Sequence, residues 1–154
     1  QDFNNQNRII LGGLDSVVIK VKHIFSTVFT NAEIINIDSK HAEMIKYFTN
    51  CFLSNKVSFA NEMHDLCSML GLDYDKVVNC ASLDERLGKT HWAVPGPDGD
   101  FGFGGHCFPK DLSAIIKLSD DLGSNSILLK SIIKSNDKVR KNRDWEKMKG
   151  RAVI

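Results

Sequence analysis

Hydrophobic residues recur at helical spacing along most of this chain and at strand spacing only near its beginning. Residues 8–13 read as a short strand that ends in glycines, and the alternation over residues 33–38 predicts a second strand. Between them, apolar residues at helical spacing follow Asp15, which can cap a helix. A strand, a helix and a strand in this order predict a parallel βαβ unit. Because two strands do not form an independent sheet, we interpret residues 1–38 as the tail of a larger α/β domain.

The longest periodic segment runs from about Ser39 to Leu70 and is closed by Gly71. Its apolar stripe comprises Ala42, Ile45, Phe48, Phe52, Phe59, Met63, Leu66 and Leu70, widened by Met44, Tyr47, Cys51 and Cys67. A helix of this length extends roughly 48 Å, further than a domain of this size covers by itself. A helix so broadly apolar needs partners on more than one side. We therefore expect a homodimer packed along residues 39–70, the alternative being a kinked helix wrapped wholly by its own chain.

Shorter helices and one long loop complete the chain. Helices are expected over residues 74–81, where Asp73 can cap, then over 109–122, and from about 126 to 147, before Gly150. Residues 89–106 contain two prolines and five glycines and predict a loop. Because long loops inside compact domains are often binding elements, and this one leads directly into Cys107, we favour a binding loop. The predicted fold class is mainly α, preceded by a partial α/β unit.

Composition and charge exclude several classes of function. The chain has 154 residues, 42% hydrophobic and 25% charged, as is ordinary for a globular protein. Its formal charge of +1 gives no overall attraction to nucleic acid or membrane, and no apolar run approaches the ~20 residues that a membrane span requires. From Ser124 onward, nine Lys and Arg face three Asp and Glu. We interpret this basic segment as a solvated helix face, because only Trp145 offers a stacking group for nucleic acid.

The cysteines are too widely spaced for a metal site. Cys51, Cys67, Cys80 and Cys107 contain no C-x-x-C pair, so no bound metal is expected. If Cys51 and Cys67 share one helix, roughly 24 Å separates them along its axis and they cannot bridge. Reduced thiols and the lack of a signal peptide favour a cytoplasmic protein.

Residues 102–111, Gly-Phe-Gly-Gly-His-Cys-Phe-Pro-Lys-Asp, join a glycine-rich loop, a cysteine and a helix start. Pro109 suits the first helical position, so Cys107 would lie just before the helix N-terminus. The unpaired N–H groups and the positive dipole end found there favour the thiolate, which is the nucleophilic form of cysteine. The alternative is a buried, inert cysteine beside an ordinary turn. The glycines would let the backbone approach a bound ligand closely.

This stretch resembles the nucleophile motif of the UDP-glucose dehydrogenases, within the UDP-glucose/GDP-mannose dehydrogenase family. Two further blocks, residues 42–62 and 83–88, resemble the family in the same order, and the similarity runs from about Arg8 to about Lys138. The resemblance implies that residues 1–38 are the C-terminal remnant of an NAD-binding Rossmann-like domain. Residues 39–154 would then be the central helical domain that forms a dimer and contacts the substrate.

The resemblance also implies an NAD-dependent, four-electron oxidation of the C6 hydroxyl of a nucleotide sugar, UDP-glucose to UDP-glucuronate. Cys107 would capture the C6 aldehyde as a thiohemiacetal and later carry a thioester that water hydrolyses. Lys46 would stabilise negative charge on the substrate oxygen, Asn50 would position that oxygen or a water, and Asp111 would assist the water. Judged by their residues alone, Lys46 can equally extend its stem along apolar surface, and Asp111 can simply favour the helix start.

Contacts to the substrate are implied for Arg86, Trp92, Phe101, Gly102, Phe103, Gly104 and Gly105. Arg86 would reach the partner subunit's nucleotide-sugar site, where its fork suits a diphosphate. The alternative for Arg86 is a surface salt bridge with Asp84 or Glu85. Lys110 matches the motif and would contact the cofactor or act only on the electrostatics of the helix end.

The dinucleotide fingerprint Gly-x-Gly-x-x-Gly does not follow a strand anywhere in this sequence. NAD would therefore be bound mainly outside this chain, and the chain alone is expected to be inactive. Three alternatives stay open: a dehydrogenase of GDP-mannose or a UDP-N-acetylhexosamine, a non-catalytic helical dimerisation module, and a thiol hydrolase that uses Cys107 with a histidine. The last is the weakest, because His106, as the adjacent residue, is expected to point elsewhere.

Overall fold

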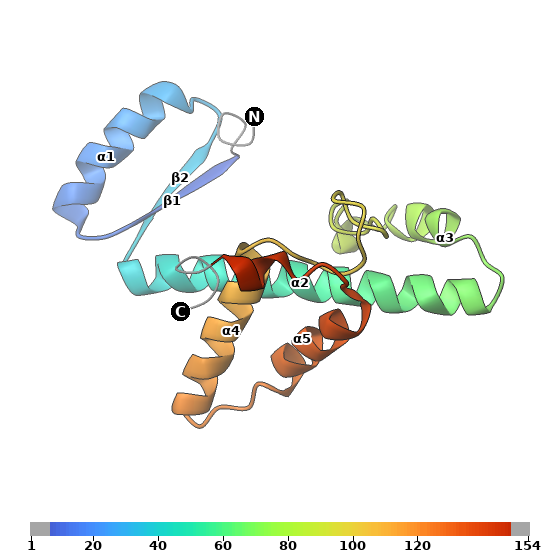
Figure 1. Ribbon diagram of the computed structural model, residues 1–154. Helices are drawn as coiled ribbons and strands as arrows, with labels where there is room; N and C mark the ends of the chain where they lie inside the picture. Colours follow the sequence, from blue (N-terminus) through green and yellow to red (C-terminus); the bar gives the residue numbers. More distant parts are fainter. Residues whose placement is uncertain (1–6, 149–154) are drawn as a thin grey trace. The chain divides into compact units, whose positions relative to one another are not determined.

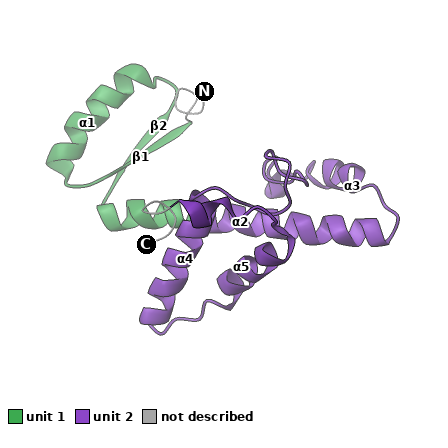
Figure 2. Ribbon diagram, viewed as in Figure 1, with its two compact units in different colours: residues 1–48 green, residues 49–154 purple. Residues whose placement is uncertain are grey.

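The computed structural model describes residues 7–148, which contain five α-helices and one two-stranded sheet (Figure 1). The predicted fold class, mainly helical with a small α/β unit, is confirmed. The chain divides into two compact units, residues 1–48 and 49–154 (Figure 2). This division falls inside helix α2 (Ser39–Met69). The predicted domain boundary between residues 38 and 39 stays a prediction.

The first unit contains the predicted βαβ arrangement. Strands β1 (Arg8–Gly12) and β2 (Glu33–Ile37) pair in parallel, and helix α1 (Asp15–Val28) connects them. The prediction that Asp15 caps this helix is wrong. Asp15 is the first helical residue, and its carboxylate instead accepts a hydrogen bond from the Asn36 amide at 2.7 Å. A Cβ on Gly12 would lie 2.5 Å from the Cβ of Ala42, so the start of α2 requires glycine at the end of β1.

Helix α2 buries two faces within the second unit, and these take in Cys51, Cys67 and, in part, Met63 of the predicted stripe but not its largest side chains. Cys51 packs in one cluster with Phe103, Leu112 and Ile132, and Ala60 and Cys67 pack in another with Tyr74 and Val94. The stripe residues Phe52, Phe59 and Leu66 are 56%, 53% and 46% exposed. The small side chains of Ser54 and Ser58 are buried instead, because they allow neighbouring segments to approach the helix closely. The strongest apolar stripe therefore faces away from the chain's own core.

Helix α3 (Tyr74–Ala81) begins at the predicted cap, where the Asp73 carboxylate accepts from the Lys76 N–H at 3.2 Å. A short 3₁₀ turn, η1 (Glu85–Leu87), leads into the long loop, and helices α4 (Cys107–Asp121) and α5 (Ile127–Val139) follow. A second 3₁₀ turn, η2 (Asp144–Lys147), ends the described chain.

The last helix is shorter than we had predicted. Helix α5 ends at Val139, and Arg140 adopts an extended backbone with φ −77° and ψ 118°. The backbone N–H of Asn142 then donates to an Asp100 carboxylate oxygen at 2.9 Å, so tertiary contacts end the helix that the sequence pattern would continue. The interpretation of the whole basic segment as a solvated face is also wrong, because the Arg140 side chain is 1% exposed. The predicted end of the pattern at Gly150 lies outside the described residues.

Neither a membrane span nor a metal cluster is found between residues 7 and 148. No helix in this range is long and apolar enough to cross a bilayer. The same range holds no group of three or more His, Cys, Asp or Glu side chains placed to bind a metal ion. Cys51 and Cys67 do share one helix, as predicted, and all four cysteines are free thiols.

Candidate active site

Side chains from two helices fix the backbone of the glycine-rich loop. The N–H of Gly102 donates to the Asn61 side-chain oxygen on α2 at 3.0 Å. Asn136 on α5 bonds Phe103 twice, accepting from its N–H at 2.7 Å and donating to its carbonyl at 3.0 Å. Gly102 has φ +67°, and a Cβ there would lie 2.3 Å from the Asn136 oxygen. Glycine is therefore required at this position for both its conformation and its close packing.

The other end of the loop is held by η2. The N–H of Gly105 donates to both carboxylate oxygens of Asp144 at 3.1 Å. Gly104 packs against Arg140, where a Cβ would lie 2.2 Å from the guanidinium Nη2. The loop is thus a rigid element, with its backbone held from three directions.

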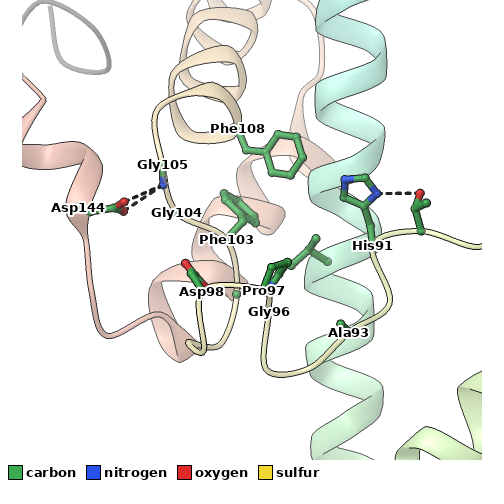
Figure 3. A pocket seen from close by; sticks show the side chains of 13 residues that line it. His91, Ala93, Gly96, Pro97, Asp98, Phe103, Gly104, Gly105, Phe108 and Asp144 are labelled. Carbon is green, nitrogen blue, oxygen red and sulfur yellow. Dashed lines mark hydrogen bonds between the residues drawn. The ribbon is translucent and has the colours of Figure 1, made fainter. Parts of the chain in front are cut away.

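A cavity of about 540 Å³ opens beside this loop, within the second unit (Figure 3). It is large enough for a ligand of nucleotide size. The rings of Phe103 and Phe108 meet edge to face at 5.7 Å between centroids. The wall contains Val57, Thr90, His91, Ala93, Gly96, Pro97, Asp98, Gly102, Phe103, Gly104, Gly105, Phe108 and Asp144. Four of the seven predicted substrate residues, those at positions 102–105, therefore lie in the cavity wall.

His91 is a member of this wall that sequence reasoning did not select. Its backbone has φ +68°, the one positive value at a non-glycine residue among those described, and such outliers cluster at functional sites. Its ring lies 6.0 Å from that of Phe108, and Nδ1 lies 2.9 Å from the Thr90 hydroxyl (Figure 3). Burial and the positive charge of Lys56 lower the pKa of His91. No local pattern marks this residue, because the path of the loop alone brings it to the cavity.

Cys107 is the first residue of α4 and is exposed to solvent. Its Sγ lies 3.6 Å from His106 Nε2, so the expectation that His106 points elsewhere is wrong. Pro109 is the third helical residue rather than the first. The hydrogen bonds of the helix begin one residue later, where the Lys110 N–H donates to the His106 carbonyl. The missing N–H of proline therefore removes no bond, and the thiol remains at the positive end of the helix.

Asp111 lies one turn after Cys107 and is completely buried. The Asn50 amide on α2 donates to one of its oxygens at 2.5 Å, and the Lys110 ammonium pairs with the other. The fold thus joins two predicted catalytic residues that are 61 positions apart. Burial and the charge of Asp111 raise the pKa of the neighbouring Cys51 thiol.

The other predicted site residues do not line the cavity. Lys46 lies on α2 one turn before Asn50, and its ammonium is 5.7 Å from the centroid of the Tyr47 ring. Arg86 is exposed and pairs with Asp84, Nη2 lying 2.5 Å from Oδ2, which is the salt bridge named as its alternative.

Two predicted aromatic residues contact protein groups instead. Trp92 donates its indole N–H to the Gly88 carbonyl at 2.7 Å, with the buried Lys56 ammonium 4.3 Å from its ring centroid. Phe101 packs edge-on against His64 at 5.7 Å between ring centroids.

The geometry defines a class of protein: a helical domain with an accessible thiol at a helix start, next in sequence to the wall of a ligand-sized cavity. The chain belongs to the UDP-glucose/GDP-mannose dehydrogenase family, whose central domain matches residues 40–138.

Relatives and a solved structure support this assignment. The chain is 32% identical over 139 residues to UDP-glucose 6-dehydrogenase TuaD of Bacillus subtilis, covering 90% of the chain and 29% of that protein. It is 36% identical over 138 residues to UDP-glucose 6-dehydrogenase of Rickettsia bellii, covering 88% and 31%. A UDP-glucose dehydrogenase structure from Pyrobaculum islandicum matches with a TM-score of 0.78 and 32% identity, over 89% of this chain and 30% of that one. The chain therefore spans about three tenths of the length of these relatives.

Proposed function

We propose that the protein containing this chain oxidises the C6 hydroxyl of UDP-glucose to a carboxylate, with this chain supplying the nucleophile and part of the nucleotide-sugar site. The observation that carries the proposal is the position of Cys107: exposed at a helix start, one turn from the buried Asp111 that Asn50 contacts, and adjacent in sequence to the cavity wall. The names of the relatives favour UDP-glucose as the substrate. GDP-mannose and a UDP-N-acetylhexosamine are the alternative substrates.

NAD is the cofactor that the family resemblance implies, and it would accept the hydrides. The described residues do not fit its usual binding element. Strand β1 leads through Gly12 and Gly13 into α1 without the third glycine of the fingerprint. The described residues therefore do not form the usual NAD-binding turn. A contact from Lys110 to NAD stays a prediction, and the Lys110 ammonium is paired with Asp111 in this structure.

The four-electron oxidation consists of two two-electron steps. The residues of this chain would act before the second step, when the aldehyde is captured, and after it, when the thioester is hydrolysed. The Cys107 thiolate adds to the carbonyl carbon of the C6 aldehyde, a C–S bond forms, and the carbonyl π electrons move to oxygen, where Lys46 would stabilise the charge. In the later hydrolysis, water adds to the thioester carbon, the C–S bond breaks, and the thiolate leaves. Asp111 would accept the proton of that water, and Asn50 would hold the carboxylate in position.

A homodimer is part of this proposal. The exposed stripe of Phe52, Phe59 and Leu66 would be covered by a second copy, because the chain leaves these large apolar side chains in water. The Arg86 side chain, 88% exposed, would then exchange Asp84 for the diphosphate in the partner's site.

The contact between Cys107 and His106 favours a second candidate, a thiol hydrolase. In that case the imidazole would accept the thiol proton, and the enzyme would cleave an ester or thioester without any oxidant. Such an activity needs no nicotinamide cofactor.

The test uses the full-length protein with NAD and candidate nucleotide sugars. We expect two NADH per UDP-glucuronate formed, and loss of the acid product by roughly a thousandfold or more in Cys107→Ala. Cys80→Ala is the matched control, because Cys80 is also exposed, and we expect its rate to stay within about twofold. Normal acid formation by Cys107→Ala would contradict the proposed nucleophile. Faster oxidation of GDP-mannose would favour the alternative substrate, and NAD-independent cleavage of thioesters would favour the hydrolase.

A further inference from the structure

Arg140 is a buried cation, whereas the other basic residues between positions 124 and 148 are exposed. Its guanidinium lies 2.7 Å from Asp98, 3.6 Å from Asp100 and 3.7 Å from Asp144. Its Nε donates to the Asn142 carbonyl at 2.8 Å. A buried arginine is retained only where such partners compensate for its lost hydration. The three carboxylates come from two segments that are far apart in the sequence, so Arg140 joins these segments.

The same guanidinium packs directly behind the glycine-rich loop. Its Nη2 occupies the space that a Cβ on Gly104 would fill, 2.2 Å away. Gly104 lines the cavity together with two of the arginine's partners, Asp98 and Asp144 (Figure 3). Asp144 in turn accepts both hydrogen bonds from the Gly105 N–H. One cation therefore supports three parts of the cavity wall.

Charge makes this support relevant to ligand binding. Three carboxylates near the cavity would repel one another and repel an anionic nucleotide if they were not compensated. Arg140 compensates part of this charge, and its hydrogen bond is the main cause of the lowered pKa of Asp98. The pKa of Asp100 is lowered first by the N–H of Asn142, which lies in the same turn as Arg140.

We propose that Arg140 is a positioning residue that holds the glycine-rich loop, Asp98 and Asp144 in the form that admits the nucleotide sugar. The proposal rests on the proposed function for the identity of the ligand. Arg140 follows the last residue matched by the family's central domain, residue 138. It acts through the residues of the wall.

The experiment compares Arg140→Met with Arg143→Met in the full-length protein. Arg143 is a matched control because it is close in sequence, 44% exposed, and paired at the surface with Asp137 and Glu146. By calorimetry, we expect the Kd for UDP-glucose to rise by roughly tenfold or more in Arg140→Met and by less than about twofold in the control. KM should rise similarly while kcat changes by less than about threefold, because the nucleophile is untouched. Arg140→Lys should restore part of the affinity, since it keeps the charge without the fork.

A second readout needs no ligand. Hydrogen exchange of the peptide covering residues 96–105 should be faster in Arg140→Met than in the control and the wild type. If the wild type does not bind UDP-glucose, the proposed function fails, but the exchange experiment still tests Arg140. Wild-type affinity together with wild-type exchange in a folded Arg140→Met protein would overturn the inference. If that variant does not fold, Asp98→Asn removes the closest partner and keeps the arginine, and unchanged exchange in it would also overturn the inference.

Discussion

Two thiols near Asp111 have different surroundings. Burial, and then the negative charge of Asp111, raise the pKa of Cys51, which disfavours its reactive thiolate form. Cys107, one helical turn away on α4, is exposed and contacts an imidazole instead. The sequence pattern predicts Cys107 as the nucleophile, and the structure adds that this thiol is exposed whereas Cys51 is buried.

The lowered pKa of His91 predicts that the stability of the protein depends on pH. Its pKa lies below the ordinary 6.5 in the folded protein, first because of burial and then because of Lys56. As the pH falls below about 6.5, the unfolded chain binds a proton at His91 before the folded protein does. We therefore expect the free energy of unfolding to decrease with falling pH, between 6.5 and the lower folded-state pKa, and to regain this contribution as the pH rises.

Urea denaturation between pH 5 and 8 measures this dependence in the wild type and in His91→Gln. In a plot of the free energy of unfolding against pH, the variant should lose the part of the slope that lies just below pH 6.5. His23→Gln is a control, because His23 lies on α1 in the other compact unit. An identical slope in the wild type and His91→Gln would show that His91 does not titrate differently on folding.

At the scale of elements, α2 combines two buried faces with an exposed apolar one. Neighbouring segments contact its small residues, and Phe52, Phe59 and Leu66 remain at the surface at helical spacing. A helix with apolar residues on nearly all sides needs contacts beyond its own unit. This supports the predicted dimer along residues 39–70, which stays a proposal.

Substituting the exposed stripe tests this dimer. We expect Phe52→Glu combined with Leu66→Glu to weaken self-association by roughly a hundredfold, since two charges would be placed in an apolar interface. Sedimentation of the full-length protein gives the association constant. Leu128→Glu is the matched control, because Leu128 is an exposed leucine outside this stripe, on α5, and its substitution should have no effect. Unchanged association of the double variant would place any dimer interface elsewhere.

At the scale of the whole molecule, the chain holds the proposed nucleophile Cys107 and a cavity but no dinucleotide fingerprint. We expect the 154-residue chain alone, mixed with UDP-glucose and NAD, to form no NADH above background at 340 nm. The full-length protein is the positive control in the same assay. NADH formation by the chain alone that depends on Cys107 would mean that NAD binds here without the usual motif.

Local sequence determined most of the elements and the position of Cys107 at a helix start. Periodicity predicted the βαβ unit and α2, and Gly71, with positive φ, follows the end of α2 at Met69, because these signals act within a few turns of the chain. The order Gly-rich loop, Cys107, Pro109 similarly located a thiol at a helix start. The resemblance of three short blocks added the family, which the comparisons confirm.

Tertiary structure alone decided which residues meet. It paired Asn50 with Asp111, brought His91 into the cavity wall, and turned Arg140 inward at the point where α5 ends. It also left the side chains of Phe52, Phe59 and Leu66 on α2 about half exposed. These outcomes depend on long-range packing and on the desolvation of charges, whose energies are set by neighbours far away in the sequence. Sequence periodicity records which side chains are apolar, and the fold determines which of them become buried.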